Sequence, residues 1–273
     1  MKLNFAPQLV HLYGPFGIHS YGIFIALGIV VSVWLARRNK RFTQLHLEKV
    51  YLDIITVSII IGCIGGRALS IISEPHLYPH WRDWFALWQG GFSALGSIIS
   101  IATVIPFYLK KIKVPILPLF DLAAIYIPLM QSIARLGCFT AGCCYGIATT
   151  SVCGVIYTHP NTLALPNVAV HPTQLYSSLI LFGIFLFMFF IGQYRIKKTG
   201  LLFATYLTCA ALERFFVDFW RADRIMVTNY LSFHQIVALC IIIITPISIF
   251  LLRQRLRSTS HFNRGPHHKK LKM

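Results

Sequence analysis

The chain has very few acidic residues. Only 8 of its 273 residues are Asp or Glu, and charged residues of both signs make up 12% of the sequence, whereas soluble domains contain about 25%. So few charges cannot cover a water-exposed surface of ordinary size, which excludes a soluble globular enzyme. Intrinsic disorder is also excluded, because disordered chains have low hydrophobicity and 56% of these residues are hydrophobic.

What the sequence does contain is long apolar runs separated by short basic segments. Its mean hydropathy is +0.66 and its net charge is +17. A helix that crosses a membrane needs about 20 mostly apolar residues. We therefore predict an all-α polytopic membrane protein with seven transmembrane helices, at 20–36, 50–72, 91–109, 114–137, 173–193, 199–218 and 233–252.

The basic residues fall mainly on one side of these runs. Eighteen of the 25 Lys and Arg lie in the segments 36–49, 110–113 and 194–198 or after the last run, and four lie on the other side. Cytoplasmic loops of membrane proteins are enriched in Lys and Arg. This asymmetry predicts an N-terminus outside and a C-terminus in the cytoplasm, and it argues for a membrane and against a nucleic-acid partner.

The remaining segments suggest a simple domain organisation. We expect one transmembrane domain at 1–253, in which the longest non-spanning segment, 138–172, forms a small cap on the outer face. A basic cytoplasmic tail is expected at 254–273. The first 19 residues lack the pattern of a cleavable signal, so the first helix is expected to stay as an anchor.

Three arginines lie inside the predicted spans, each near the outer end: Arg67, Arg135 and Arg214. An arginine in a span costs at least ~2.5 kcal/mol on insertion scales, so three at one depth need a reason. Guanidinium groups bind phosphate in a bidentate fork, which suggests an anionic headgroup. The alternative is that each arginine pairs with a carboxylate, such as Asp218 one turn beyond Arg214, or reaches to the interface.

Other polar residues gather at the same end of the predicted helices. Together with the arginines they predict a functional site that faces the outer leaflet. They are Tyr21, Ser93, His171, Thr173, Gln174, Tyr176, Asp218 and Arg221.

At these residues the sequence resembles a known family. The run His171-Pro172-Thr173-Gln174-Leu175-Tyr176 resembles the signature of the prolipoprotein diacylglyceryl transferases, and further blocks agree in order and spacing over residues 18–225. These blocks are Ser20-Tyr21-Gly22, Gly65-Gly66-Arg67, Gly90-Gly91-Phe92-Ser93, Arg135-Leu136-Gly137 with Gly142 and Tyr145-Gly146, and Arg214-Phe215 with Asp218 and Arg221.

The resemblance implies an activity and a setting. Family members sit in the bacterial inner (plasma) membrane, where they transfer a diacylglyceryl group from phosphatidylglycerol to the lipobox cysteine of a preprolipoprotein, without a cofactor. The resemblance implies that Arg135 and Arg214 are the main phosphate and transition-state residues. It also implies a substrate-binding pocket made of Tyr21, Arg67, Ser93, Gln174, Tyr176, Asp218 and Arg221.

The chain departs from the family pattern at several polar positions, as a divergent member would. Leu95 stands where the family carries a histidine, Cys138 and Cys143 replace an asparagine and a glutamate, and Ala210 replaces a tyrosine. Because leucine cannot move a proton, a transferase would need another base, for which His171 is the candidate. A non-catalytic lipid- or lipoprotein-binding protein and a lipid transporter remain as alternatives.

Four of the seven cysteines lie close together in the outer segment: Cys138, Cys143, Cys144 and Cys153. Because that side is oxidising in many bacteria, one or two disulfides are plausible, and a reactive thiol or small packing residues are the alternatives. A metal site that includes His159 or His171 is a further alternative. The spacing matches no standard zinc pattern, so we expect no metal.

Overall fold

The computed structural model describes residues 2–5, 8–13, 16–86, 90–160 and 162–262. Long helices dominate the described part of the chain, and each begins within a few residues of the start of a predicted apolar run. They are α1 (Ser20–Arg37), α3 (Tyr51–Ser73), α4 (Ala94–Lys111), α5 (Ile116–Ala141), α6 (Thr173–Phe187), α8 (Leu201–Val217) and α9 (Phe233–Phe262).

Short helical turns connect the long helices. α2 (Lys40–Gln44) and the 3-10 turn η1 (Leu47–Lys49) lead from α1 to α3, and η2 (Pro75–Leu77) and η3 (Trp81–Phe85) follow α3. A π-helical turn, η5 (Met188–Gly192), and α7 (Gln193–Arg195) extend α6, while η6 (Asp218–Trp220) extends α8.

Among the described residues, five helical stretches are long and apolar enough to cross a membrane. They are α1, α3, α4, α5 and the continuous stretch Thr173–Arg195 that begins with α6. The predicted sixth span is helical but shorter, because α8 has 17 residues, and the predicted seventh span lies within α9, whose stretch Phe233–Ile249 is apolar. A mostly helical membrane protein is therefore confirmed, while seven spans and their orientation stay predictions.

The end of α9 differs from the predicted boundary. The helix continues to Phe262 rather than ending at 252, so the first part of the predicted tail is helical. The rest of the tail, 263–273, lies outside the described residues.

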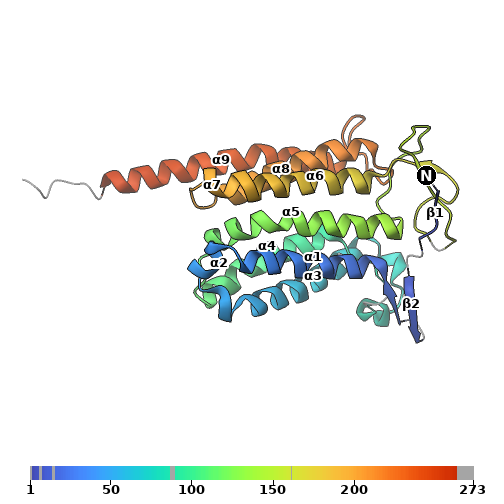
Figure 1. Cartoon of the computed structure of the whole chain (residues 1–273), viewed down its shortest axis with the longest axis horizontal. Helices are drawn as coiled ribbons and strands as arrows, with labels where there is room; N and C mark the ends of the chain where they lie inside the picture. Colours follow the sequence, from blue (N-terminus) through green and yellow to red (C-terminus); the bar gives the residue numbers. More distant parts are fainter. Residues whose placement is uncertain (1, 6–7, 14–15, 87–89, 161, 263–273) are drawn as a thin grey trace, which may run out of the picture.

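The long helices run side by side along one axis, with α5 in the middle. Figure 1 shows α6, α8 and α9 on one side of α5 and α1, α3 and α4 on the other. α5 packs against α1, α6 and α8, while α3 pairs with α4 and α8 pairs with α9. The fold thus places the C-terminal ends of α5 and α8 next to the N-terminal end of α6.

Two small sheets lie at one end of the helices, and the all-α prediction missed them. β1 (Lys2–Leu3) pairs in parallel with β4 (Val155–Tyr157), which pairs antiparallel with β5 (Ala169–Val170); β2 (Gln8–Tyr13) and β3 (Phe16–His19) form a hairpin. These strands are too short to give a clear alternation of apolar and polar residues. The first sheet belongs to a small core of its own that includes Leu3, Tyr157 and Val170.

Candidate functional site

Three arginines gather where α5 and α8 end. Arg135 lies in the last part of α5, Arg214 in the last turn of α8, and Arg221 directly after η6. Arg214 lies within electrostatic reach of both Arg135 and Arg221, and Arg135 within reach of Arg221. The predicted convergence of arginines therefore exists, but its third member is Arg221 and not Arg67.

The carboxylates near this arginine cluster neutralise it only in part. Arg221 forms a bidentate pair with Asp223, at 2.8 Å and 2.5 Å, whereas Arg214 lies 3.5 Å from Asp218. The half-buried Arg135 makes no side-chain hydrogen bond with the described residues. In this cluster Arg214 has only a long contact with a carboxylate, and the guanidinium of Arg135 has none of its N–H groups bonded to a described residue. Such guanidiniums can bind an anion such as phosphate.

The Asp223 carboxylate keeps Arg221 in place. Burial alone would raise the pKa of Asp223, but the hydrogen bond and the charge of Arg221 hold this pKa below its ordinary value. The Arg221 side chain is itself buried. Asp223, which sequence reasoning did not single out, is therefore ionised and paired at neutral pH.

Arg67 has contacts of a different kind. It is 3% exposed, and its guanidinium donates to five backbone carbonyls: Asp83, Trp84, Ala86, Gly90 and Gly91. Its guanidinium carbon also lies 4.5 Å from the centre of the Tyr78 ring. With its donors occupied in this way, Arg67 fastens the segment after η2 to α3, and the geometry favours this structural role over the predicted substrate binding.

Ser93 also has a local structural role. It is the N-cap of α4, where its hydroxyl accepts a hydrogen bond from the backbone N–H of Gly96 at 3.4 Å. Leu95, at the position of the family histidine, lies half-buried in the first turn of the same helix.

Asp218 is a buried centre of polar contacts. It is 1% exposed, accepts a hydrogen bond from the Ser232 hydroxyl and lies 3.7 Å from Arg224 as well as near Arg214. Its Oδ1 has no hydrogen-bond partner among the described residues. Asp218 is therefore a buried carboxylate shared by Arg214 and Arg224, and its predicted part in substrate binding stays a prediction.

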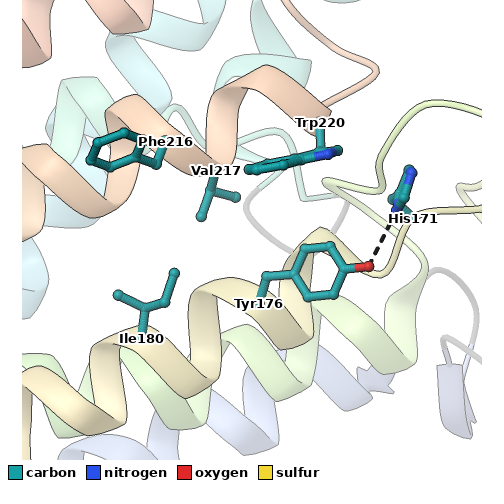
Figure 2. A pocket seen from close by; sticks show the side chains of 6 residues that line it. All are labelled: His171, Tyr176, Ile180, Phe216, Val217 and Trp220. Atoms are coloured by element: carbon teal, nitrogen blue, oxygen red, sulfur yellow. Dashed lines mark hydrogen bonds between the residues drawn. The ribbon is translucent and has the colours of Figure 1, made fainter. Parts of the chain in front are cut away.

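An apolar pocket of about 330 Å³ lies between α6 and the end of α8, and its lining residue Trp220 directly precedes Arg221 in the chain. Figure 2 shows Tyr176 and Ile180 on α6 facing the side chains on the other wall, with His171 at one end. The lining residues are His171, Tyr176, Ile180, Phe216, Val217 and Trp220. Such a lining suits hydrocarbon.

His171 and Tyr176 are the polar groups of this pocket. The Nδ1 of His171 lies 3.2 Å from the Tyr176 hydroxyl, as the dashed line in Figure 2 marks. Gly146 and Ile147 link His171 to the turn that follows α8. The N–H of Gly146 donates to the carbonyl of His171 at 2.9 Å, and the N–H of Ile147 donates to the carbonyl of Trp220 at 2.8 Å. The predicted His171–Tyr176 motif thus places an imidazole and a phenol hydroxyl together at the pocket.

Gln174 holds the loop after α5. It is 1% exposed, and its amide donates to the backbone carbonyl of Cys143 at 2.8 Å and to the Tyr157 hydroxyl at 3.3 Å. Thr173 beside it donates to the carbonyl of Cys144 at 2.7 Å. Tyr21, in the first turn of α1, is 42% exposed and lies within electrostatic reach of Arg135.

Three of the four cysteines between residues 138 and 153 form a cluster. The Sγ atoms of Cys138, Cys143 and Cys144 all lie within 4.8 Å of one another, while Cys153 is exposed and is not part of this group. All seven cysteines are free thiols, so the structure does not contain the disulfide that the sequence suggested. Hydrogen bonds from Cys138 and Cys143, together with the charges of Arg221 and Arg135, lower the pKa of Cys144.

Near the arginine cluster, sequence reasoning missed the buried acid Glu213. It is 6% exposed, accepts a hydrogen bond from the Ser177 hydroxyl of α6, and lies within electrostatic reach of Arg135. An acidic residue inside an apolar run is itself an unusual feature. That signal, directly before Arg214, could have identified it.

The comparisons with known proteins identify the family of the chain. The family model described as prolipoprotein diacylglyceryl transferase matches residues 7–251. The chain is 33% identical to a Clostridium tetani protein named phosphatidylglycerol–prolipoprotein diacylglyceryl transferase, over 87% of this chain and 94% of the relative. It is 35% identical to a Clostridium perfringens protein named phosphatidylglycerol–prolipoprotein diacylglyceryl transferase 2, over 83% and 88%. A Dehalococcoides mccartyi protein with the first of these names is 32% identical, over 89% and 92%.

Proposed function

The chain belongs to the prolipoprotein diacylglyceryl transferase family, and we propose that it transfers the diacylglyceryl group of phosphatidylglycerol to the lipobox cysteine of a preprolipoprotein. It is a transferase of lipoprotein biosynthesis. The observation that carries the proposal is the arginine cluster of Arg135, Arg214 and Arg221 beside an apolar pocket. A phospholipid needs both, because it joins an anionic phosphate to hydrocarbon chains.

The substrate takes a defined orientation in this proposal. The phosphate binds between Arg135 and Arg214, while acyl chains enter the pocket between α6 and α8. Asp218 and Asp223 act as positioning residues, since each holds one arginine of the cluster. Tyr21 borders the headgroup from α1.

The reaction is a substitution at carbon. The lipobox thiol gives its proton to His171, and its sulfur attacks the glyceryl carbon that carries the phosphate. The carbon–sulfur bond forms as the carbon–oxygen bond breaks, and glycerol phosphate leaves with the electron pair. Because negative charge grows on the departing phosphate, the guanidiniums of Arg135 and Arg214 stabilise the transition state more than the ground state.

The proposal includes a location and an orientation. The protein lies in the bacterial inner membrane with seven helices across it, with the arginine cluster at the outer leaflet and the C-terminus in the cytoplasm. The basic segments between the helices support this orientation.

A mass-shift assay tests the function. Purified protein in detergent is incubated with phosphatidylglycerol and a lipobox peptide, and the diacylglyceryl adduct and released glycerol phosphate are measured. Arg135→Ala is expected to lower kcat/KM by about 10²–10³-fold, as loss of one transition-state donor does. The matched control is Arg82→Ala, because Arg82 is exposed and lies outside the cluster.

Two outcomes separate the alternatives. An adduct that depends on Arg135 supports transfer with a base other than the family histidine. Absence of any adduct, with phosphatidylglycerol binding intact, would favour the non-catalytic lipid-binding protein, whose support is Leu95 at the family histidine position.

A further inference from the structure

The cluster of Cys138, Cys143 and Cys144 has no part in the reaction described above. We propose that these three cysteines form a binding site for one soft, thiophilic metal ion, held by three thiolates beside the arginine cluster. The site is independent of the proposed transferase activity. It rests on the positions of the three sulfur atoms, the backbone that holds them and the charges around them.

The spacing of the sulfur atoms fits a metal. Metal–sulfur bonds of about 2.3 Å place three ligating sulfurs roughly 3.8–4.0 Å apart. The three Sγ atoms already lie within 4.8 Å of one another. Side-chain rotations that move each Sγ atom by less than about 1 Å would therefore bring the three sulfurs to ligating distance, without movement of a helix.

The backbone fixes the three positions relative to one another. Cys138 lies in the last turn of α5, Gly142 ends this helix with a φ of 75°, and the N–H of Cys143 donates to the carbonyl of Cys138 at 3.2 Å. Thr173 and Gln174 then bind the carbonyls of Cys144 and Cys143 from α6. Cys144 has a φ of 60°, a left-handed conformation that is uncommon for a non-glycine residue, and it brings a third thiol to the first two.

The surrounding charges favour thiolates. Arg135 and Arg221 both lie within electrostatic reach of Cys144, and the thiolate is the form that binds metal. Three thiolates that bind a divalent cation carry a net charge of about −1, and three thiolates that bind a monovalent cation carry a net charge of about −2. Arg135, and in part Arg221, which also pairs with Asp223, offset this negative charge in a half-buried setting, where an unpaired charge is costly.

The ligand set selects the class of metal. No His, Asp or Glu among the described residues joins the three thiols in this group. Hard cations such as Ca²⁺ and Mg²⁺ prefer oxygen ligands, whereas thiolates select soft or borderline ions such as Cu⁺ and Zn²⁺. A site with three sulfurs suits three-coordinate Cu⁺, or Zn²⁺ with its fourth position left for water.

A Cd²⁺ titration tests this site, because cadmium–thiolate bonds absorb in the near ultraviolet. The full-length protein in detergent is reduced with a phosphine, which removes disulfides, and is then titrated with Cd²⁺ alone. We expect the absorbance to saturate at one Cd²⁺ per chain. Bound Cd²⁺ should also protect three thiols of the wild-type protein from maleimide, as counted by intact mass, a readout that needs no variant.

Matched variants locate the site. Cys138→Ser, Cys143→Ser and Cys144→Ser are each expected to weaken Cd²⁺ binding at least about tenfold, since each removes one thiolate ligand. Cys153→Ser is expected to bind like wild type, because Cys153 is an outer cysteine outside the cluster. Elution as a single species in size exclusion shows which variants are folded.

Three results would overturn the proposal. The first is that the reduced protein binds no Cd²⁺, and the second is that binding survives unchanged in the folded cluster variants. The third is that the protein purified without reductant carries a disulfide between two cluster cysteines, in which case these thiols form a redox pair instead.

Discussion

At the scale of single residues, the site depends on which polar groups are occupied and which are free. Arg67 donates to backbone carbonyls and Arg221 is held by Asp223, whereas Arg135 makes no side-chain hydrogen bond with the described residues. The pattern of arginines in the sequence cannot separate these cases. Two predictions follow from the groups that remain free to react.

His171 is expected to act as the base. His171→Ala should lower kcat by about 10²–10⁴-fold, as loss of a general base does. Tyr176→Phe should lower kcat by less than about tenfold, because it removes one hydrogen bond that orients the imidazole. His76→Ala serves as the control, since His76 is exposed and lies outside the pocket. The rates come from the mass-shift assay, and an unchanged kcat for His171→Ala would mean that another group accepts the proton.

Cys144 is expected to be the most acidic thiol of its cluster. Its pKa is lowered, whereas hydrogen bonds from Cys138 and Cys144, with burial, raise the pKa of Cys143. A group with a lowered pKa stays ionised as the pH falls below the ordinary thiol value of about 8.5. Alkylation by iodoacetamide near neutral pH, in the presence of a chelator, should therefore modify Cys144 before Cys143. Fragment ions distinguish the two neighbours, and faster labelling of Cys143 would contradict this assignment.

At the scale of elements, buried contacts between helices set their positions. The N-terminus of α8 follows Gly200, which has no side chain to cap it. Asp121 of α5 supplies the acceptor instead: its carboxylate accepts from the backbone N–H of Gly200 at 2.6 Å and of Phe203 at 2.9 Å. One side chain on the central helix thus fixes the start of the helix that carries Arg214.

Asp121→Ala should therefore destabilise the protein. Two N–H groups would lose their partner, at a cost of about 2–4 kcal/mol in the free energy of unfolding. Asp121→Asn should cost less, because the amide oxygen keeps one acceptor. Unfolding in detergent micelles measures both, and equal stability of the wild type and Asp121→Ala would show that this cap contributes nothing.

The pairing of α3 with α4 depends on glycine. A Cβ on Gly96 would lie 2.4 Å from the carbonyl oxygen of Gly65 and 2.6 Å from the Cβ of Leu69, and small residues are what allows membrane helices to approach so closely.

Gly96→Ala should lower stability by about 1–3 kcal/mol, because the helices must move apart. Gly183→Ala is the matched control: no atom lies within 4 Å of its added Cβ, and the higher helix propensity of alanine should leave stability unchanged or raise it by up to about 1 kcal/mol. Thermal unfolding compares the two, and an equal effect would place α3 and α4 further apart than described.

At the scale of the whole molecule, the distribution of burial matches a bundle with lipid around it. In the apolar windows of α1, α3 and α4, 17% of residues are buried, whereas 44% are buried in α5. The central helix is therefore packed against protein, and the outer helices leave most of their apolar surface to the bilayer. A bilayer can supply that environment, since its hydrocarbon is as apolar as these side chains.

The orientation of the molecule is expected to be visible in intact cells. Cys153 is exposed on the proposed outer side, and Lys111 is exposed on the proposed cytoplasmic side. A membrane-impermeant maleimide should label wild-type protein at Cys153 without permeabilisation, and this label should be lost in Cys153→Ser. With Cys153→Ser as background, Lys111→Cys should be labelled only after permeabilisation. The reverse pattern would invert the proposed topology.

The sequence by itself determined the class of protein, the helices and the family. Apolar runs dictate helices in a membrane because each helix satisfies its own backbone hydrogen bonds, and the motifs around Arg135, His171 and Arg214 mark the family whatever their contacts. Only the tertiary structure decided which side chains meet. It placed Arg221 rather than Arg67 with Arg135 and Arg214, and it brought Glu213 and Ser177 together. It also gathered three thiols without a disulfide. These contacts depend on how each helix is rotated about its axis and on close packing between segments far apart in the chain. The spacing of residues along the sequence specifies neither.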